Sequence, residues 1–301
     1  MQKVASLPRK WRVKALQMQP ESPSSRLHFL GRKCPQASRT RQSVRSETPE
    51  NSAFPRTRCI PARYWLDEKV ARAELMSPRT KAVQRALVKL GINDEPNPDD
   101  IQLNYDSYRM AFRDVAASTN ERTAIATVLP PKRFCPHTVS LEQVCSDVVT
   151  EQGHFSQPGL QPDERLYVTS VFNSYVVDWF IRQSVTAHVS FFFVYNIPVL
   201  RLSASDPRLE PIVQRAARLT CTTPEFDDLA QSVGLQGYQD GATDPSERAQ
   251  LRAELDGLVA HLDGLSEAEF THILGTFPLV AEPVKVAALN AWRDVERGLV
   301  V

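Results

Sequence analysis

The chain has 301 residues, with 36 basic and 35 acidic side chains and a formal net charge of +1. Its 42% hydrophobic and 24% charged residues are typical of globular proteins, and exclude collagen, a coiled coil and wholesale disorder. The richest apolar stretch, residues 189–194, is far shorter than the roughly 18 residues that a transmembrane helix needs.

The charges are unevenly distributed. Residues 1–60 carry 13 basic and 3 acidic side chains, whereas residues 151–301 carry 11 basic and 20 acidic ones. The first 60 residues contain little to bury, so we expect a disordered basic extension. Its alternatives are a phosphate-binding arm, a transit peptide and an extension created by an upstream start codon.

The five cysteines indicate a reducing compartment. Their number is odd and no apolar signal-peptide core precedes them, so we expect free thiols and a cytoplasmic protein.

The pattern of apolar residues predicts an α+β fold. We expect a small mixed or antiparallel sheet with packed helices at 61–202, then a mainly helical part at 203–301. The elements predicted in the first part are a helix at 77–91, strands at 108–115, 123–129 and 137–144, a loop at 151–162, a buried helix at 166–182 and a strand at 189–195.

Residues typical of helix ends set several of these boundaries. A Ser-Pro pair at 77–78 and Gly91 bound the first helix, whose buried face is expected to hold Val83, Leu87 and Leu90.

In the helical part, the expected helix starts are Asp206-Pro207, Thr223-Pro224 and Asp244-Pro245, a capping box at Ser266–Glu269 with a Leu265–Phe270 staple, and a final helix near 283–297.

Motifs for catalysis are missing from the sequence. It contains neither a G-x-G-x-x-G loop nor a G-x-x-x-x-G-K-[ST] phosphate loop. It also lacks the [DNS]-P-P-[YFW] loop of amino-methyltransferases. The nearest match, Leu129-Pro130-Pro131-Lys132, has an apolar residue where the acceptor belongs, and two prolines that end a strand explain it better.

A zinc site is one interpretation of Cys135, His137, Cys145 and His154. Their gaps of one, seven and eight residues differ from the usual zinc spacings, so isolated thiols and surface histidines are favoured. We therefore predict neither a metal site nor a catalytic residue in this chain.

Three segments carry a family resemblance. The first is YRMAFRDVAASTNERTAIATVLPP at 108–131, and the second joins VFNSYVVDWFIRQ at 171–183 to HVSFFFVYNIPV at 188–199. The third joins LRAELDGL at 251–258 to LSEAEFTHILGTFP at 265–278. In this order they resemble the C-terminal target-recognition region of large single-chain type II restriction–modification proteins, which are adenine-specific DNA methyltransferases.

The resemblance implies recognition of double-stranded DNA rather than catalysis. The cofactor loop and the Asn-Pro-Pro-Tyr loop of that family lie upstream of this region, and neither is present here. S-adenosylmethionine is therefore expected only in a methyltransferase domain outside this chain. The resemblance favours a truncated, split or frameshifted family member, whose partner is a methyltransferase or nuclease subunit.

Residues 108–133 supply most of the side chains expected to contact DNA. Arginine pairs with guanine and asparagine with adenine, and each pair discriminates by about 1–3 kcal/mol. The candidates are Arg109, Arg113, Ser118, Thr119, Asn120, Arg122, Lys132, Arg133 and, further along the chain, His188.

Each candidate also has a structural interpretation. Arg113 beside Asp114 and Arg122 beside Glu121 are equally consistent with surface ion pairs worth about 0–1 kcal/mol, and His188 with a boundary histidine. Arg109 and Arg113 are expected on one strand face, which favours a shared partner. Two other functions stay open: an inactive fragment or protein-interaction module without DNA binding, and a complete methyltransferase that binds S-adenosylmethionine.

Overall fold

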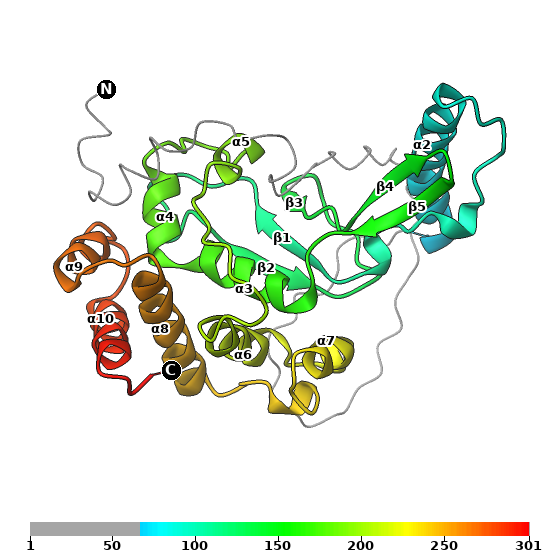
Figure 1. Ribbon diagram of the computed structural model, residues 1–301. Helices are drawn as coiled ribbons and strands as arrows, with labels where there is room; N and C mark the ends of the chain where they lie inside the picture. Colours follow the sequence, from blue (N-terminus) through cyan, green and yellow to red (C-terminus); the bar gives the residue numbers. More distant parts are fainter. Residues whose placement is uncertain (1–66, 301) are drawn as a thin grey trace, which may run out of the picture.

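The computed structural model describes residues 67–300, and confirms an α+β fold built from helices and small antiparallel sheets (Figure 1). The extension predicted at 1–60 lies outside the described residues. The main elements are α2 (Glu68–Lys89), β1 (Arg109–Arg113), β2 (Ala126–Leu129), β3 (Val139–Leu141), β4 (Cys145–Thr150), β5 (Gly153–Pro158), α3 (Pro162–Asn173), α4 (Tyr175–Arg182), α5 (Phe191–Val194), α6 (Leu209–Thr220), α7 (Asp227–Ser232), α8 (Pro245–Leu262), α9 (Glu267–Gly275) and α10 (Glu282–Glu296). Short 3-10 turns occupy Pro98–Asp100, Asn104–Asp106, Pro224–Phe226 and Tyr238–Asp240.

A three-stranded antiparallel sheet lies at the centre of the molecule. Strand β1 runs between β2 and β3, with Arg109 opposite Leu129 and Phe112 opposite Ser140. The sheet confirms the two strands predicted from alternating apolar residues and the further strand predicted at 137–144, although each is shorter than expected. Met110 and Phe112 of β1 are fully buried, because helix α3 covers this face of the sheet.

The loop predicted at 151–162 is wrong, since Gly153–Pro158 forms strand β5. It pairs with β4 in a hairpin whose last pair joins Thr150 to Gly153. Gly153 has a φ of +118°, which lets the chain reverse within two residues. Figure 1 shows this hairpin and α2 side by side at one end of the molecule, and α8, α9 and α10 at the other.

Helix α2 begins nine residues before the predicted start at Ser77. Asp67 caps it by accepting a hydrogen bond from Val70 N at 3.0 Å, so the proline at position 78 lies inside the helix rather than at its first turn. Val83 and Leu87 are buried as predicted. Leu90, expected on the same face, is 48% exposed, because the helix ends at Lys89.

The single helix predicted at 166–182 is two helices. Ser174 adopts an extended conformation between α3 and α4, and its hydroxyl accepts a hydrogen bond from Val177 N at 3.2 Å. A serine that caps a new helix competes with continuation of the old one. The break changes the direction of the chain and aims Asp178 of α4 at the loop between β1 and β2.

The aromatic strand predicted at 189–195 is also wrong. Strand-like pairing stops at the isolated bridge between Val115 and His188, and Phe191–Val194 forms the one-turn helix α5. The ring of Phe191 packs against Phe112 of the sheet, with centroids 5.5 Å apart. Helical geometry then leaves Phe192 on the opposite side, 72% exposed.

The helical part follows its capping signals closely. Asp244 caps α8 through hydrogen bonds from Ser246 N and Glu247 N, both at 2.9 Å. The capping box at Ser266 is present, and both Leu265 and Phe270 are buried. Helix α6 begins at residue 209, slightly later than predicted.

One large hydrophobic cluster joins the sheet to the helices. It contains Phe112 of β1, Phe172 of α3, Ile212 of α6 and Leu255 of α8, so it extends across the boundary predicted between residues 202 and 203. No helix within residues 67–300 is both long enough and apolar enough to cross a membrane.

Candidate nucleic-acid interface

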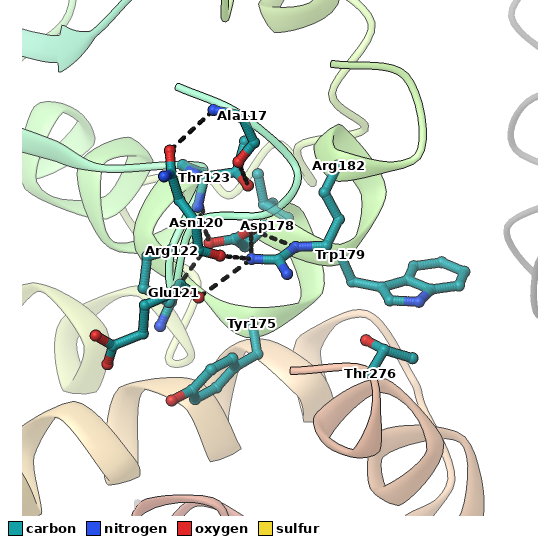
Figure 2. Close-up of polar contacts among 12 residues, drawn as sticks. Ala117, Asn120, Glu121, Arg122, Thr123, Tyr175, Asp178, Trp179, Arg182 and Thr276 are labelled. Atoms are coloured by element: carbon teal, nitrogen blue, oxygen red, sulfur yellow. Dashed lines mark hydrogen bonds and ion pairs between the residues drawn. The ribbon is translucent and has the colours of Figure 1, made fainter. Parts of the chain in front are cut away.

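The loop between β1 and β2 is held in place by hydrogen bonds to a buried carboxylate. We call residues 117–122 the arginine loop. Asp178 of α4 is fully buried, and its Oδ2 accepts hydrogen bonds from Arg122 Nε at 2.8 Å, Thr123 N at 2.9 Å and Ala124 N at 3.3 Å (Figure 2). Its Oδ1 accepts from Arg182 Nε at 3.0 Å. A buried carboxylate with this many donors fixes the loop in one conformation.

Arg122 is a structural residue in this arrangement. Its guanidinium also donates to the carbonyl of Asn173 and lies over the ring of Tyr175, 4.2 Å from the centroid. Burial opposes the charge of Arg122, but the carboxylates of Asp256 and Asp178 outweigh burial and raise its pKa. The predicted base contact of Arg122 is therefore replaced, in this structure, by contacts inside the protein.

A second buried carboxylate, from Asp256, interacts electrostatically with Arg122. Asp256 of α8 accepts a hydrogen bond from Tyr175 N at 2.9 Å. Burial raises the pKa of Asp256 to about 6, even though Arg122 attracts its charged form. The cation thus links three parts of the fold: the arginine loop, α4 and α8.

The tip of the arginine loop is a tight, internally bonded turn. Asn120 Oδ1 accepts from Ala117 N at 2.9 Å, and Asn120 N donates to Ala117 O at 3.0 Å. Arg182 Nη2 supports the tip by donating to the carbonyls of Asn120 and Glu121 at 3.4 and 3.2 Å. Thr119 and Asn120 are exposed and Ser118 is half-buried. Since Asn120 Oδ1 is already engaged, the outward donors of this side chain are its amide hydrogens.

The structure places His188 beside the arginine loop. Its side chain is 61% exposed, with Nδ1 3.4 Å from Asp114 Oδ2. Backbone hydrogen bonds from Ala116 N to Ala187 O at 3.1 Å and from Val189 N to Asp114 O at 2.7 Å join the two segments. Four of the predicted residues therefore share one surface: Ser118, Thr119, Asn120 and His188.

Arg109 and Arg113 face different carbonyls instead of a shared partner. Arg109 is only 3% exposed and donates to the carbonyl of Arg133. Arg113 donates from Nη2 to the carbonyl of Arg122 at 2.7 Å. Arg109 therefore holds the backbone of residue 133 at one end of β1, and Arg113 holds the backbone of residue 122 at the other end.

Lys132 and Arg133 lie at the opposite end of β1 from the arginine loop. Lys132 has a φ of +61°, and its N–H donates to Tyr105 O at 2.7 Å. Its Nζ is 3.7 Å from Glu68, and Arg133 is paired with Glu225. Both basic side chains are more than half exposed.

Two of the residues considered for zinc, Cys145 and His154, have other contacts. His154 Nε2 is 3.0 Å from Asp147, and the thiol of Cys145 contacts Arg79 at 3.2 Å. Within residues 67–300, no three His, Cys, Asp or Glu side chains are grouped so that they could hold a metal ion.

Sequence reasoning missed Asp178, Arg182 and Asp256, which organise the site. One signal existed for the first pair: an aspartate in the apolar run Val176–Phe180, with an arginine four residues later. Also missed was a cleft of about 1,430 Å³ beneath the arginine loop, between β2 and helices α8 and α10.

Comparisons with protein families, with curated proteins and with solved structures give no match for this chain.

Proposed function

We propose that this chain is the DNA sequence-recognition portion of a restriction–modification protein, with adenine methylation supplied by a domain outside it. The observation that carries the proposal is the arginine loop. It belongs to the first resembling segment, a buried carboxylate holds it rigid, and it presents short polar side chains beside His188. Rigid donors and acceptors of this kind are suited to base edges, since little entropy is lost on binding.

The two ends of β1 have separate roles in this proposal. Ser118, Thr119, the amide of Asn120 and His188 contact base edges, while Lys132 and Arg133 contact phosphates. The five residues of β1 alone extend about 13 Å, and the two groups lie beyond its opposite ends. A major groove is about 12 Å wide, so one face of the sheet spans from the bases to a flanking strand.

A protein-interaction module is the second candidate function, and the charge of residues 151–301 favours it. Twenty acidic against 11 basic side chains repel a phosphate backbone. In the DNA-recognition proposal the helical part at 203–301, which carries 16 of these acidic side chains, faces away from DNA and binds a methyltransferase or nuclease subunit in the cytoplasm.

Duplex selection tests the proposal. The full chain is incubated with a pool of random duplexes at low salt, and the affinity of the selected sequence is measured against salt concentration. Wild-type protein should bind. The double variant S118A/T119A should lose discrimination at the base pairs that these two residues contact, and the removal of each base-specific hydrogen bond should weaken binding by about 1–3 kcal/mol.

The phosphate contacts have a different signature. K132A/R133A should lower the slope of log K against log salt by about 1.8, because two cations that displace counterions from the phosphates are removed. The exposed Lys81 on α2 provides the control, K81A, with an unchanged slope. Absence of duplex binding at low salt overturns the proposal, and calorimetric binding of S-adenosylmethionine would support the complete-methyltransferase alternative.

A further inference from the structure

The cleft beneath the arginine loop has a basic end that the proposed function does not use. We call the whole cleft, about 1,430 Å³ in volume, the helical cleft. Its basic end lies where the last turn of α6 and the segment after it meet the first half of α8; Figure 1 shows these two helices side by side. The side chains that line this end are Leu219, Thr220, Thr222, Phe226, Arg248 and Arg252. The cleft wall therefore carries two guanidinium groups about one helical turn apart.

These two arginines lack the carboxylate partner that is usual in this fold. Most arginines within residues 67–300 pair with a carboxylate, as Arg215 does with Glu254 at 2.6 Å. Within the same residues, Arg248 and Arg252 form no such ion pair. Burial and the neighbouring charge of Arg252 lower the pKa of Arg248, whereas nearby carboxylates raise that of Arg122. Like charges four residues apart on a helix repel, so an anion that binds both would remove this repulsion.

Hydrogen bonds fix the position of Arg248 at the end of α6. Its Nη1 donates to Leu219 O at 3.0 Å and to Ala242 O at 2.7 Å. A cation is favoured at the C-terminus of a helix, which explains this contact but uses only one of the three guanidinium nitrogens. The N–H groups on Nε and Nη2 remain for a ligand. Arg248 is thus held in place before a ligand binds, and the exposed Arg252 is able to approach from the next turn of α8.

Most carboxylates in the helical cleft have partners of their own. Four carboxylates line the cleft, and one of them belongs to the arginine loop. Of the other three, Glu254 pairs with Arg215, Asp294 lies 3.8 Å from Arg297, and Asp256 is buried against the arginine loop. Salt largely screens charges more than about 8–10 Å apart. The basic end is therefore locally positive, although residues 203–301 are acidic overall.

We propose that the basic end of the helical cleft binds the phosphate of a small phosphate monoester. Such a group carries close to two negative charges at neutral pH, which matches two guanidinium groups, and guanidinium N–H donors pair well with phosphate oxygens. Thr220 and Thr222 add hydroxyls, and Phe226 offers an apolar face to the organic part of the ligand. The cleft is larger than a typical small-molecule pocket, so it has room for that part. This inference goes beyond the proposed function and does not depend on DNA binding.

Isothermal titration calorimetry of the full chain with phenyl phosphate tests the inference. Wild-type protein should bind it at neutral pH with a Kd below about 1 mM. Inorganic phosphate should bind more weakly, because it lacks a ring to contact Phe226. Benzoate, which has the same ring but a single charge, should bind about tenfold more weakly than phenyl phosphate. Equal binding of benzoate overturns the choice of phosphate, and equal binding of inorganic phosphate overturns the organic part.

Matched variants locate the site. R252Q removes one guanidinium from an exposed position and should lower the affinity for phenyl phosphate about tenfold, whereas R252K keeps the charge and should lose less. Arg252 is changed rather than Arg248 because Arg248 also supports the end of α6. The exposed Arg201 lies outside the cleft and provides the control R201Q, with affinity unchanged within about twofold. Equal affinities of R252Q and R201Q overturn the site.

DNA is a second source of phosphate, and the duplex assay distinguishes it from a small molecule. R252Q should leave the slope of log K against log salt unchanged. A slope lowered by about 0.9 would assign Arg252 to the DNA backbone and overturn the small-molecule site. Absence of duplex binding overturns the proposed function alone, whereas absence of phenyl phosphate binding overturns this inference alone.

Discussion

At one end of β1 the partly buried Arg122 guanidinium pairs with the fully buried Asp178 and stacks on Tyr175, whereas at the other end Arg133 is half-exposed beside Glu225. Both arginines belong to the region expected to contact DNA, and both have a carboxylate partner. They differ in how much water reaches the pair, because Asp178 is fully buried while Glu225 is 47% exposed.

The difference shows that a basic residue in a resembling segment has two distinct uses. Arg122 gives the arginine loop its shape, so its loss acts on DNA through the fold. Arg133 keeps access to solvent, and a phosphate is able to replace Glu225 as its partner with little change in free energy. We call the end of β1 beside Arg122 the structural end and the end beside Arg133 the binding end. The predictions below test whether the two ends have these separate roles.

The largest effect is expected for D178A. The substitution leaves the partly buried guanidinium of Arg122 and two backbone N–H groups without this acceptor, and removes an acceptor from Arg182 as well. Removing one member of a buried pair destabilises a protein by about 3–5 kcal/mol. Urea unfolding of the full chain measures the change, with E74A, at an exposed position of α2, as the control. A loss below about 1 kcal/mol would show that the structural end resembles the exposed end.

The sequence was sufficient for elements whose signals are local. The capping residues Asp244 and Ser266 predicted two helix starts, because an N-cap acts within its own first turn. Alternation predicted β1 and β2 for a similar reason. Hairpin β4–β5 was missed, since glycine and proline near residues 151–162 resemble a loop until a partner strand is known.

Contacts between residues far apart in the sequence determine two features that the sequence alone left open: the secondary structure at 191–193 and the role of Arg122. The run of phenylalanines at 191–193 suits a strand as well as a helix, and packing of Phe191 on Phe112, 79 residues away, decides between them. The role of Arg122 depends on Asp178, 56 residues away. Composition and spacing place neither partner, so both interpretations of this arginine stayed open.

An intermediate effect on the unfolding free energy is expected from the titration of Asp256. Its pH dependence measures how far water is excluded from the structural end. Burial raises the pKa of its carboxyl from 3.8 to about 6, so the folded state holds this proton more tightly than the unfolded chain. The contribution of Asp256 to stability is therefore greatest below about pH 4 and is lost as the pH rises through 6. Two pKa units correspond to a loss of about 2–3 kcal/mol.

The variant D256N isolates this contribution, because asparagine keeps an acceptor for Tyr175 N and does not titrate. The unfolding free energy of the wild-type protein minus that of D256N should fall between pH 4 and 6, and should level off above pH 7. A difference that stays constant across this range would mean that Asp256 titrates normally and that the structural end is accessible to water.

The smallest effect is expected at the binding end, for R133A. The pair with Glu225 is about half exposed on both sides, and such pairs contribute about 0–1 kcal/mol because water and salt screen them. Urea unfolding should therefore show a change within this range, which a high salt concentration abolishes. The backbone carbonyl of Arg133, which accepts from Arg109, is retained in the variant, so the turn keeps its anchor. A loss as large as that of D178A would mean that both ends of β1 are structural, and would leave Lys132 as the basic residue at this end with a solvent-exposed role.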